Sequence, residues 1–315
     1  MGYTGGMKLT LNYLATYPKV FQALTGLRVR EFDELLDDLA SAYATAEVRR
    51  LSRPGRKRAL GGGDKPDLAV AEQLLVSVIW MRKYPTTEVL GFLFGVSGVT
   101  VGRLLGRWLP VLEAAGRDTF RLPDPGRKRR PGLDALLADL PELAVIVDTF
   151  EQRVQRPPRR AEADRYYSGK KKQHTFKSQI AVDDQSGLIV DVAASVPGPS
   201  NDLTVLKESG LLARLPTGVG ALGDLAYVGI AKVMPAGLGL TPRRKPPSQP
   251  RPSEDVAYNR AFARHRVKIE HTIGRLRHYE ALRHMDRHHR QGHTARVVAI
   301  AGLVNRQIQA RLPAC

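Results

Sequence analysis

Cysteine is nearly absent from this sequence, and long apolar runs are missing altogether. The one cysteine, Cys315, excludes a disulfide within the chain and a cysteine-rich zinc site. Apolar runs such as Leu74–Ile79 are far shorter than the roughly 20 residues that span a bilayer. Residues 1–8 lack the apolar stretch of a secretory signal. We therefore expect a soluble protein of the cytoplasm.

Acidic residues are also in short supply relative to basic ones. The chain has 31 Asp and Glu against 49 Lys and Arg, which gives a formal net charge of +18. Such a surplus attracts a polyanion, and nucleic acid is the commonest one. The alternative is a basic protein from an organism in which arginine is simply frequent. With 315 residues, 43% of them hydrophobic, the chain can form a packed core.

Two basic segments rich in proline and glycine, Arg49–Pro66 and Arg121–Pro131, interrupt the chain. Both are expected to be exposed connections, because Pro and Gly break regular structure and the cations resist burial. We expect an N-terminal helical arm with a basic linker over 1–66, a compact helical module over 67–120 and a larger domain over 132–315.

The middle module has the periodicity of helices. Four apolar residues share one helical face: Leu74, Leu75, Val78 and Ile79. Thr86 or Thr87 caps the start of a second helix, and a turn at Gly95–Ser97 precedes a third. This order is typical of a helix-turn-helix, although a plain helical bundle remains the alternative. The face expected to meet DNA presents Thr100, Arg103 and Arg107.

The C-terminal region changes to a strand-rich pattern. Strands are expected at 143–148, 176–184, 187–196 and 219–222, with a hairpin turn between the second and third. Helices are expected from Asn201 or Asp202, over 254–282 and over 293–312. This order predicts an α/β domain with a mixed sheet flanked by helices.

Three acids stand out in that domain. Asp148 and Asp224 each close an apolar strand, so adjacent strands would bring both carboxylates to one sheet edge. Glu270 lies on the long helix, on a side left free by packing at Val267, Ile269, Ile273 and Leu276. Carboxylate oxygens are the ligands that Mg²⁺ prefers, and paired metals activate a water or a 3′-hydroxyl. Each acid alone has a structural explanation, such as a turn, a helix start or a pair with Arg266.

Three segments carry a resemblance to a known family: Tyr166–Lys177, Pro197–Asp202 and Leu222–Tyr227. They resemble signatures of the insertion-sequence-five group of DDE transposases, relatives of the eukaryotic Harbinger transposases. The resemblance covers nearly the whole chain. It implies an RNase H-like catalytic domain preceded by an all-α helix-turn-helix module. It also implies that the catalytic and metal-binding acids are Asp148, Asp224 and Glu270.

The sequence departs from the family pattern at a few positions. Asp148 is followed by Thr149–Glu151 where the family has Gly-Thr. Ala263 stands where a tyrosine is expected ahead of Glu270, and Arg277 replaces a lysine. Arginine keeps the charge that would grip a phosphate, with a more fork-like geometry.

Asp202 is the competing candidate for the second acid, since it too follows a strand by a short loop. We interpret Asp202 as a cap of the following helix or as a support of the site. Asp224 is preferred because it ends a core strand directly. Glu151 and Glu280 are weaker alternatives.

Basic residues near these acids are expected to contact DNA. A first group precedes a strand and would line the DNA path: Lys170, Lys171, Lys172, His174 and Lys177. Arg266, Arg275 and Arg277 flank Glu270 and would hold phosphates. The alternative for the lysines is a solvated hairpin. A zinc site among His278, His284, His288, His289 and His293 is disfavoured, because no cysteine lies near and the spacing fits no ligand pattern.

The sequence therefore predicts a cut-and-paste DNA transposase with Mg²⁺ as cofactor and Mn²⁺ as a substitute. Its partners would be double-stranded DNA, namely terminal inverted repeats and target DNA. Pairing two ends implies a homodimer or larger assembly on the nucleoid. Two alternatives stay open. One is a non-catalytic DNA-binding regulator derived from a transposase, and the other is a metal-dependent endonuclease without strand transfer.

Overall fold

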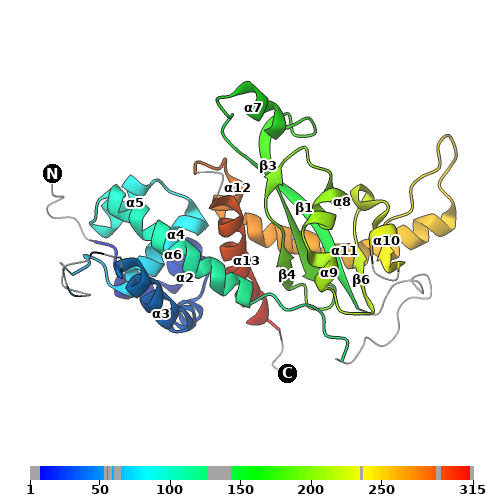
Figure 1. The fold of residues 1–315 in the computed structure, drawn as a ribbon. Helices are drawn as coiled ribbons and strands as arrows, with labels where there is room; N and C mark the ends of the chain where they lie inside the picture. Colours follow the sequence, from blue (N-terminus) through cyan, green and yellow to red (C-terminus); the bar gives the residue numbers. More distant parts are fainter. Residues whose placement is uncertain are drawn as a thin grey trace. The chain divides into compact units, whose positions relative to one another are not determined.

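A computed structural model describes residues 8–52, 55, 59, 65–126, 143–234, 237–288 and 292–312. The chain forms two compact units. One extends to Arg117 and includes His278–His284, and the other comprises Asp118–Arg277 and Met285 onward (Figure 1). Cys315, His289 and parts of both basic linkers lie outside the described residues.

The first unit is all helical. Its elements are α1 (Leu11–Ala15), α2 (Pro18–Thr25), α3 (Val29–Leu51), α4 (Val70–Lys83), α5 (Thr87–Phe94), α6 (Gly98–Asp118) and the short α12 (Glu280–Arg283). Helix α4 is buried over Gln73–Met81, so it is the core helix of the unit. The rings of Tyr43 and Trp108 stack with centroids 4.1 Å apart, which joins α3 to α6.

The predicted order of helices in the middle module is confirmed, and its turns have clear local causes. Tyr84 ends α4 in the left-handed region just before Pro85, which cannot continue a helix. The Thr86 hydroxyl accepts from the Val89 N–H and caps α5. Gly95 ends α5 with a φ of 69°. A Cβ on Gly91 would lie 2.6 Å from the Val96 carbonyl oxygen, so this tight turn requires glycine.

The long C-terminal helix is shorter than expected. Helix α11 spans Ser253–Arg277, and the chain breaks before α12 instead of continuing to Leu282. Tyr279 is fully buried at the break, and the Arg82 guanidinium lies 5.2 Å from its ring centroid. Burial of this ring against α4 outweighs the helical propensity of the segment.

The second unit contains a mixed sheet. Its strands are β1 (Leu143–Arg153), β2 (Tyr167–Ser168), β3 (Gln173–Asp183), β4 (Ile189–Val192), β5 (Val196–Pro197), β6 (Val219–Leu222) and β7 (Gly239–Leu240). The main path runs β2-β3-β1-β6-β7, with β4 and β5 also paired to β3. Strand β3 is antiparallel to β1, whereas β6 is parallel to β1 and β7 to β6. The expected α/β fold with a mixed sheet flanked by helices is confirmed (Figure 1).

Asp148 does not end its strand, contrary to the prediction. Strand β1 continues to Arg153, because β3 pairs with it along its length, from Val145↔Asp183 to Arg153↔Thr175. Alternation along β1 therefore decides which way Asp148 points. Leu143, Val145 and Val147 pack on one face against the helices that follow β5, so Asp148 points to the opposite face.

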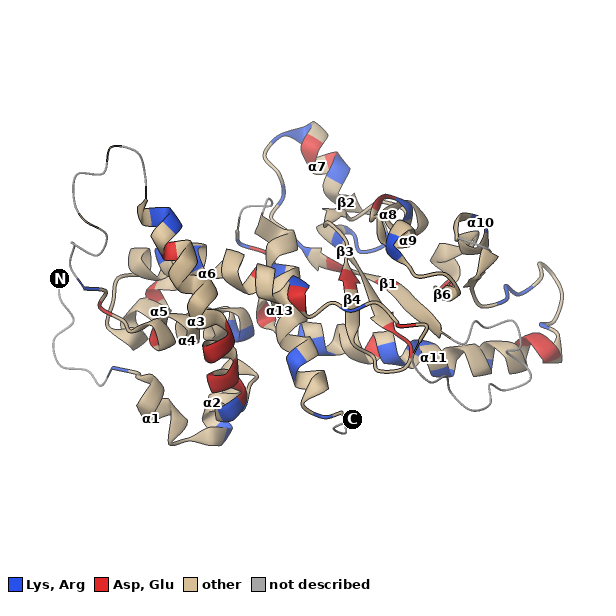
Figure 2. Ribbon diagram, turned by 60° about the horizontal axis from the view of Figure 1, so that its bottom comes forward, with Lys and Arg blue, Asp and Glu red and all other residues tan. Residues whose placement is uncertain are grey.

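Helices cover both faces of this sheet. One face carries α8 (Asp202–Glu208), α9 (Leu211–Arg214), a 3₁₀ turn at Leu225–Tyr227 and α10 (Ile230–Val233), which supply a core cluster with β1 and β6. The other face carries α11 and α13 (His293–Gln309). A further helix, α7 (Arg160–Tyr166), follows β1 and precedes β2 along the chain. It has basic residues at both ends (Figure 2).

The rotation of α11 about its axis is fixed by the turn between β3 and β4. The His265 ring nitrogen Nδ1 lies 3.0 Å from both carboxylate oxygens of Asp184, and the Thr272 hydroxyl donates to the Gly187 carbonyl. Asn305 of α13 bonds to both backbone groups of Ile189. These contacts aim the remaining face of α11 at the centre of β1.

Among the described residues, no single helix is both long and apolar enough to cross a membrane. The pair α5 and α6 reaches that length and composition only together, with a bend of 103° between them.

Candidate active site

Asp148 is half-buried within β1. Its Oδ1 accepts the Thr149 N–H at 2.7 Å, and its Oδ2 accepts from Arg266 Nη2 at 3.3 Å. The pKa of Asp148 is raised to about 6, mainly by burial and to a smaller extent by the charges of Asp224 and Asp202, while the Thr149 N–H and Arg266 act to lower it. A carboxyl group with a raised pKa should bind a cation readily, because the positive charge would offset the cost of ionising the group.

Asp224 follows β6 as the sequence predicted. The parallel register pairs Ile146 with Leu222, and Asp148 and Asp224 each lie two residues further on. Both acids thus lie at the same level on neighbouring segments. The Asp224 Oδ1 accepts the Ala226 N–H at 2.9 Å and so caps the 3₁₀ turn. Its other carboxylate oxygen has no hydrogen-bond partner within the described part of the chain.

The residues around Asp224 have a packing reason. A Cβ on Gly223 would lie 2.6 Å from Tyr227, so glycine lets that ring reach the sheet. Tyr227 is fully buried, and its hydroxyl donates to Gln179 Oε1 at 3.1 Å. Burial and the neighbouring acids raise the pKa of Tyr227 well above its usual value, so the phenol stays neutral.

Glu270 stands on the face of α11 that looks toward β1, and it is more exposed than the other two acids. Its side chain is 56% exposed, and its Oε1 lies 3.8 Å from Arg266 Nη2. Ile269 and Leu276 pack inward as expected, but Val267 is 41% exposed and does not contribute to the core. Arg266 therefore links Glu270 to Asp148.

The donor set fits a hard divalent cation in its chemistry, since all three candidate ligands are carboxylates. Burial, with smaller contributions from the charges of Asp224 and Asp202, raises the pKa of Asp148, and a bound cation would offset each of these costs. Within the described residues, however, no three His, Cys, Asp or Glu side chains converge as a ready metal site. The guanidinium of Arg266 lies between Asp148 and Glu270 instead.

Asp202 has a different environment from the one predicted for a cap. The cap of α8 is Asn201, whose Oδ1 accepts the Thr204 N–H at 3.1 Å. Asp202 is the first helical residue, and its Oδ1 lies 2.5 Å from Lys177 Nζ. Its charge nevertheless reaches Asp148. The Asp202 carboxylate is thus already paired with Lys177, which supports the preference for Asp224 as the second ligand.

The two weaker candidates lie elsewhere. Glu151 accepts the Thr175 hydroxyl at 2.6 Å, and both pack against Gly198, where a Cβ would lie 1.9 Å from the threonine oxygen. This contact explains the glycine of the Pro197–Asp202 segment. Glu280 belongs to the helical unit, where it lies 4.0 Å from Lys83.

The basic residues of the α/β unit divide into exposed and engaged groups. Lys170, Lys171 and Lys172 are exposed in the turn between β2 and β3, and Arg277 is exposed at the end of α11. His174 is half-buried, with its ring 5.5 Å from that of Tyr167. Lys177 differs from the expectation that it lines a DNA path. Its side chain is buried and bonds to Asp202 and the Ser200 carbonyl.

The face predicted for DNA on α6 is only partly open. Arg103 is exposed. The hydroxyl of Thr100 lies 3.0 Å from that of Ser97. Arg107 is half-buried and interacts with Tyr43 and Glu47 of α3.

The histidines do not form a metal site within the described residues. His293 is buried between the Ser195 hydroxyl at 2.7 Å and Gln152 Oε1 at 2.8 Å. Burial lowers its pKa to about 3, so the ring is neutral and structural. His284 pairs with Glu280 at 3.4 Å in the helical unit.

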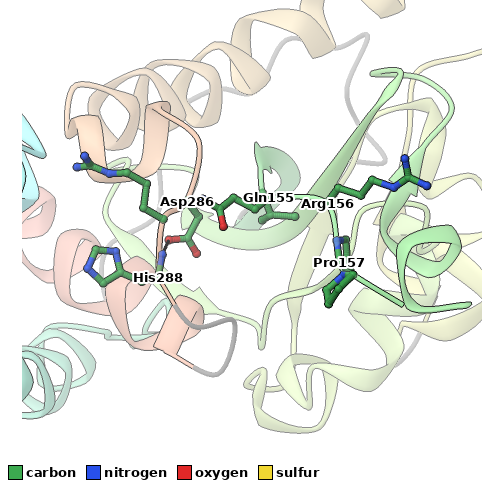
Figure 3. Close-up of a pocket in the computed structure, with 8 residues that line it drawn as sticks. Gln155, Arg156, Pro157, Asp286 and His288 are labelled. Carbon is green, nitrogen blue, oxygen red and sulfur yellow. Dashed lines mark hydrogen bonds between the residues drawn. The ribbon is translucent and has the colours of Figure 1, made fainter. Parts of the chain in front are cut away.

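A pocket of about 280 Å³ lies apart from the acids. Its walls are Val154–Pro158 after β1 and Asp286–His288 before α13 (Figure 3). Asp286 is buried and paired with Arg296. The pocket begins six residues along the chain from Asp148, or about 20 Å in extended chain. It is therefore a feature of the far end of β1 and not part of the acid cluster.

Sequence reasoning missed two contacts that shape this site. It assigned Arg266 and Lys177 to DNA, yet each is paired with an acid of the same unit. Only the pair of Arg266 with Glu270 was open to prediction, from their helical spacing. Asp148 is 118 residues from Arg266 along the chain, and Asp202 is 25 residues from Lys177, so no local sequence pattern reveals these two pairs.

Comparison with known proteins assigns this chain to a family. Residues 147–305 match the DDE superfamily endonuclease family, and residues 66–118 match the helix-turn-helix of DDE superfamily endonucleases. The chain belongs to the DDE superfamily endonucleases.

Two relatives are similar over most of their length. One is a probable transposase for insertion sequence element IS702 from Microchaete diplosiphon, 26% identical over 91% of this chain and 94% of the relative. The other is a putative transposase for insertion sequence element IS112 from Streptomyces albus G, 24% identical over 85% and 88%. No solved structure matches.

Proposed function

We propose that this protein is an insertion-sequence DNA transposase that cleaves element ends and transfers their 3′-hydroxyls into target DNA. The observation that carries the proposal is the matched position of Asp148 and Asp224 beyond the paired residues Ile146 and Leu222, with Glu270 linked to Asp148 through Arg266. The family match and the two similar transposases support it.

Asp148, Asp224 and Glu270 are the proposed ligands of Mg²⁺, with Mn²⁺ as a substitute. A bound pair of such ions supplies an activated oxygen nucleophile and stabilises the leaving oxygen of a phosphodiester. The chain itself fixes the geometry. The register of β1 and β6 sets the level of the two aspartates, and Tyr227 supports the turn that Asp224 caps.

DNA binding is proposed for exposed cations of both units. In the helical unit Arg103 of α6 faces solvent, within the segment that matches the family helix-turn-helix. To contact DNA, Thr100 would give up its hydrogen bond with Ser97, and Arg107 would give up its interaction with Tyr43. In the α/β unit the exposed turn at Lys170–Lys172 is suited to phosphate contacts. His174 beside this turn and Arg277 at the end of α11 are secondary candidates.

Two element ends must be held together for joining, so we propose a dimer or larger assembly on terminal inverted repeats. Cleavage without joining would assign the protein to metal-dependent endonucleases. Binding without either reaction would assign it to DNA-binding regulators derived from transposases.

The test is a strand-transfer assay with labelled inverted-repeat ends, a target plasmid and Mg²⁺. Asp224→Asn should abolish both cleavage and joining while end binding persists. The matched control is Glu208→Gln, which changes an exposed acid of α8 and should leave both reactions intact. Full activity in Asp224→Asn would refute the assignment of the second acid.

A further inference from the structure

The guanidinium of Arg266 lies between two of the three proposed ligands, Asp148 and Glu270. Its Nη2 lies 3.3 Å from Asp148 Oδ2 and 3.8 Å from Glu270 Oε1, and its side chain is 19% exposed. Both carboxylates therefore share one cation that belongs to the chain. Among the described residues, no three acidic or imidazole side chains form a group that could hold a metal ion.

A divalent cation and this guanidinium compete for the same oxygen. Mg²⁺ binds carboxylate oxygens at about 2.1 Å and demands a near-octahedral shell. A cationic nitrogen at 3.3 Å from Asp148 Oδ2 repels such an ion and fills part of its shell. Cation binding between Asp148 and Glu270 therefore requires Arg266 to move.

The same arginine has unused capacity for an anion. One edge of a guanidinium presents Nε and Nη2 together, a fork that matches phosphate oxygens. Nη2 already donates to Asp148, whereas Nε is buried and has no hydrogen-bond partner in the described chain. An unpaired buried donor is costly, so a phosphate that took both nitrogens would relieve it.

We propose that Arg266 is a tethered countercation that holds Asp148 and Glu270 until a DNA phosphate draws it away. This inference rests on the proposed function, because it concerns the same acids. DNA binding frees the carboxylates for the divalent cation, and cation binding releases Arg266 for the phosphate. The two affinities then strengthen each other by the same factor, since coupling between binding sites is reciprocal.

The test measures Mn²⁺ binding directly, by electron paramagnetic resonance of free Mn²⁺, with and without duplex DNA. Binding of Mn²⁺ to the same DNA alone is subtracted. For the unaltered protein we expect DNA to tighten Mn²⁺ binding about tenfold, within the usual range of such couplings. Arg266→Gln should bind Mn²⁺ about tenfold more tightly without DNA and gain little when DNA is added. Arg266→Lys, which keeps the charge, should resemble the unaltered protein.

Two controls separate this inference from the proposed function. Arg264→Gln removes a neighbouring exposed charge of α11 and should leave Mn²⁺ binding unchanged. Asp224→Asn should lose Mn²⁺ binding. If it binds as the unaltered protein does, the proposed metal site itself is wrong. If Asp224→Asn loses binding but Arg266→Gln binds Mn²⁺ no more tightly, or DNA does not tighten binding to the unaltered protein, the countercation role is overturned.

Discussion

Replacing Asp148 with asparagine should stabilise the α/β unit at neutral pH in the absence of metal. The carboxylate is buried, and the charges of Asp224 and Asp202 add to the cost of ionising it. Asparagine has nearly the same shape and no charge. Its side-chain oxygen can still accept from the Thr149 N–H, whereas its amide nitrogen, like the hydroxyl of the protonated acid, does not carry the charge that Arg266 pairs with.

The magnitude follows from the pKa of Asp148, which rises from its usual 3.8 to about 6. The folded state binds this proton more tightly than the unfolded state, so the unaltered protein loses stability as pH rises through this window. At about 1.4 kcal/mol per pKa unit, the loss amounts to about 3 kcal/mol above pH 6. Asparagine does not ionise and avoids the loss. The advantage of Asp148→Asn should therefore be near zero at pH 4 and approach about 3 kcal/mol at pH 7.5.

Urea unfolding followed by circular dichroism in chelator, at several pH values from 4 to 8, measures this difference. Asp33→Asn, a change of an exposed acid on α3, serves as the control and should give no such trend. Equal stability of Asp148→Asn and the unaltered protein at pH 7.5 would refute the argument from burial. Added Mg²⁺ should stabilise the unaltered protein but not the variant, since only the carboxylate holds the cation.

Two further changes test the engaged and the exposed cations. Lys177→Met removes the partner of the Asp202 carboxylate and should lower the free energy of unfolding by about 3 kcal/mol, as expected for a broken buried pair. Adding Asp202→Leu to this variant should recover most of the lost stability. If Lys177→Met alone is as stable as the unaltered protein in urea unfolding, the pairing is contradicted. Alanines at Lys170–Lys172 should reduce the slope of log K for DNA against log salt by up to about 0.9 per lost phosphate contact. An unchanged slope in a filter-binding titration would remove this turn from the DNA path.

The local signals in the sequence were sufficient for several elements. Strand β6 and the position of Asp224 were predicted from a short apolar run that ends in Gly223. The start of α5 was predicted from the threonines at 86 and 87, and its end from the turn that begins at Gly95. Each of these rests on residues within a few positions of one another, where capping and backbone freedom decide the outcome.

Long-range packing decided the features that the sequence did not reveal. Strand β1 runs past Asp148 because β3 pairs with it, although the apolar run stops at that residue. The break before α12 follows from burial of Tyr279, with no glycine or proline to mark it. The roles of Arg266 and Lys177 depend on partners that only the fold brings near, so charge counting alone assigned both to DNA.

The placement of α12 limits how the protein can be divided experimentally. Its residues return to the helical unit after α11 and before α13, which both belong to the other unit. A fragment that stops at Asp118 leaves the surface of α4 that Tyr279 and Leu282 cover open to water. A fragment that begins after Asp118 carries those two apolar side chains without their partner, and such exposure favours aggregation. Binding and catalysis are therefore best separated by point substitution in the full chain, because neither half is complete when it is cut from the other.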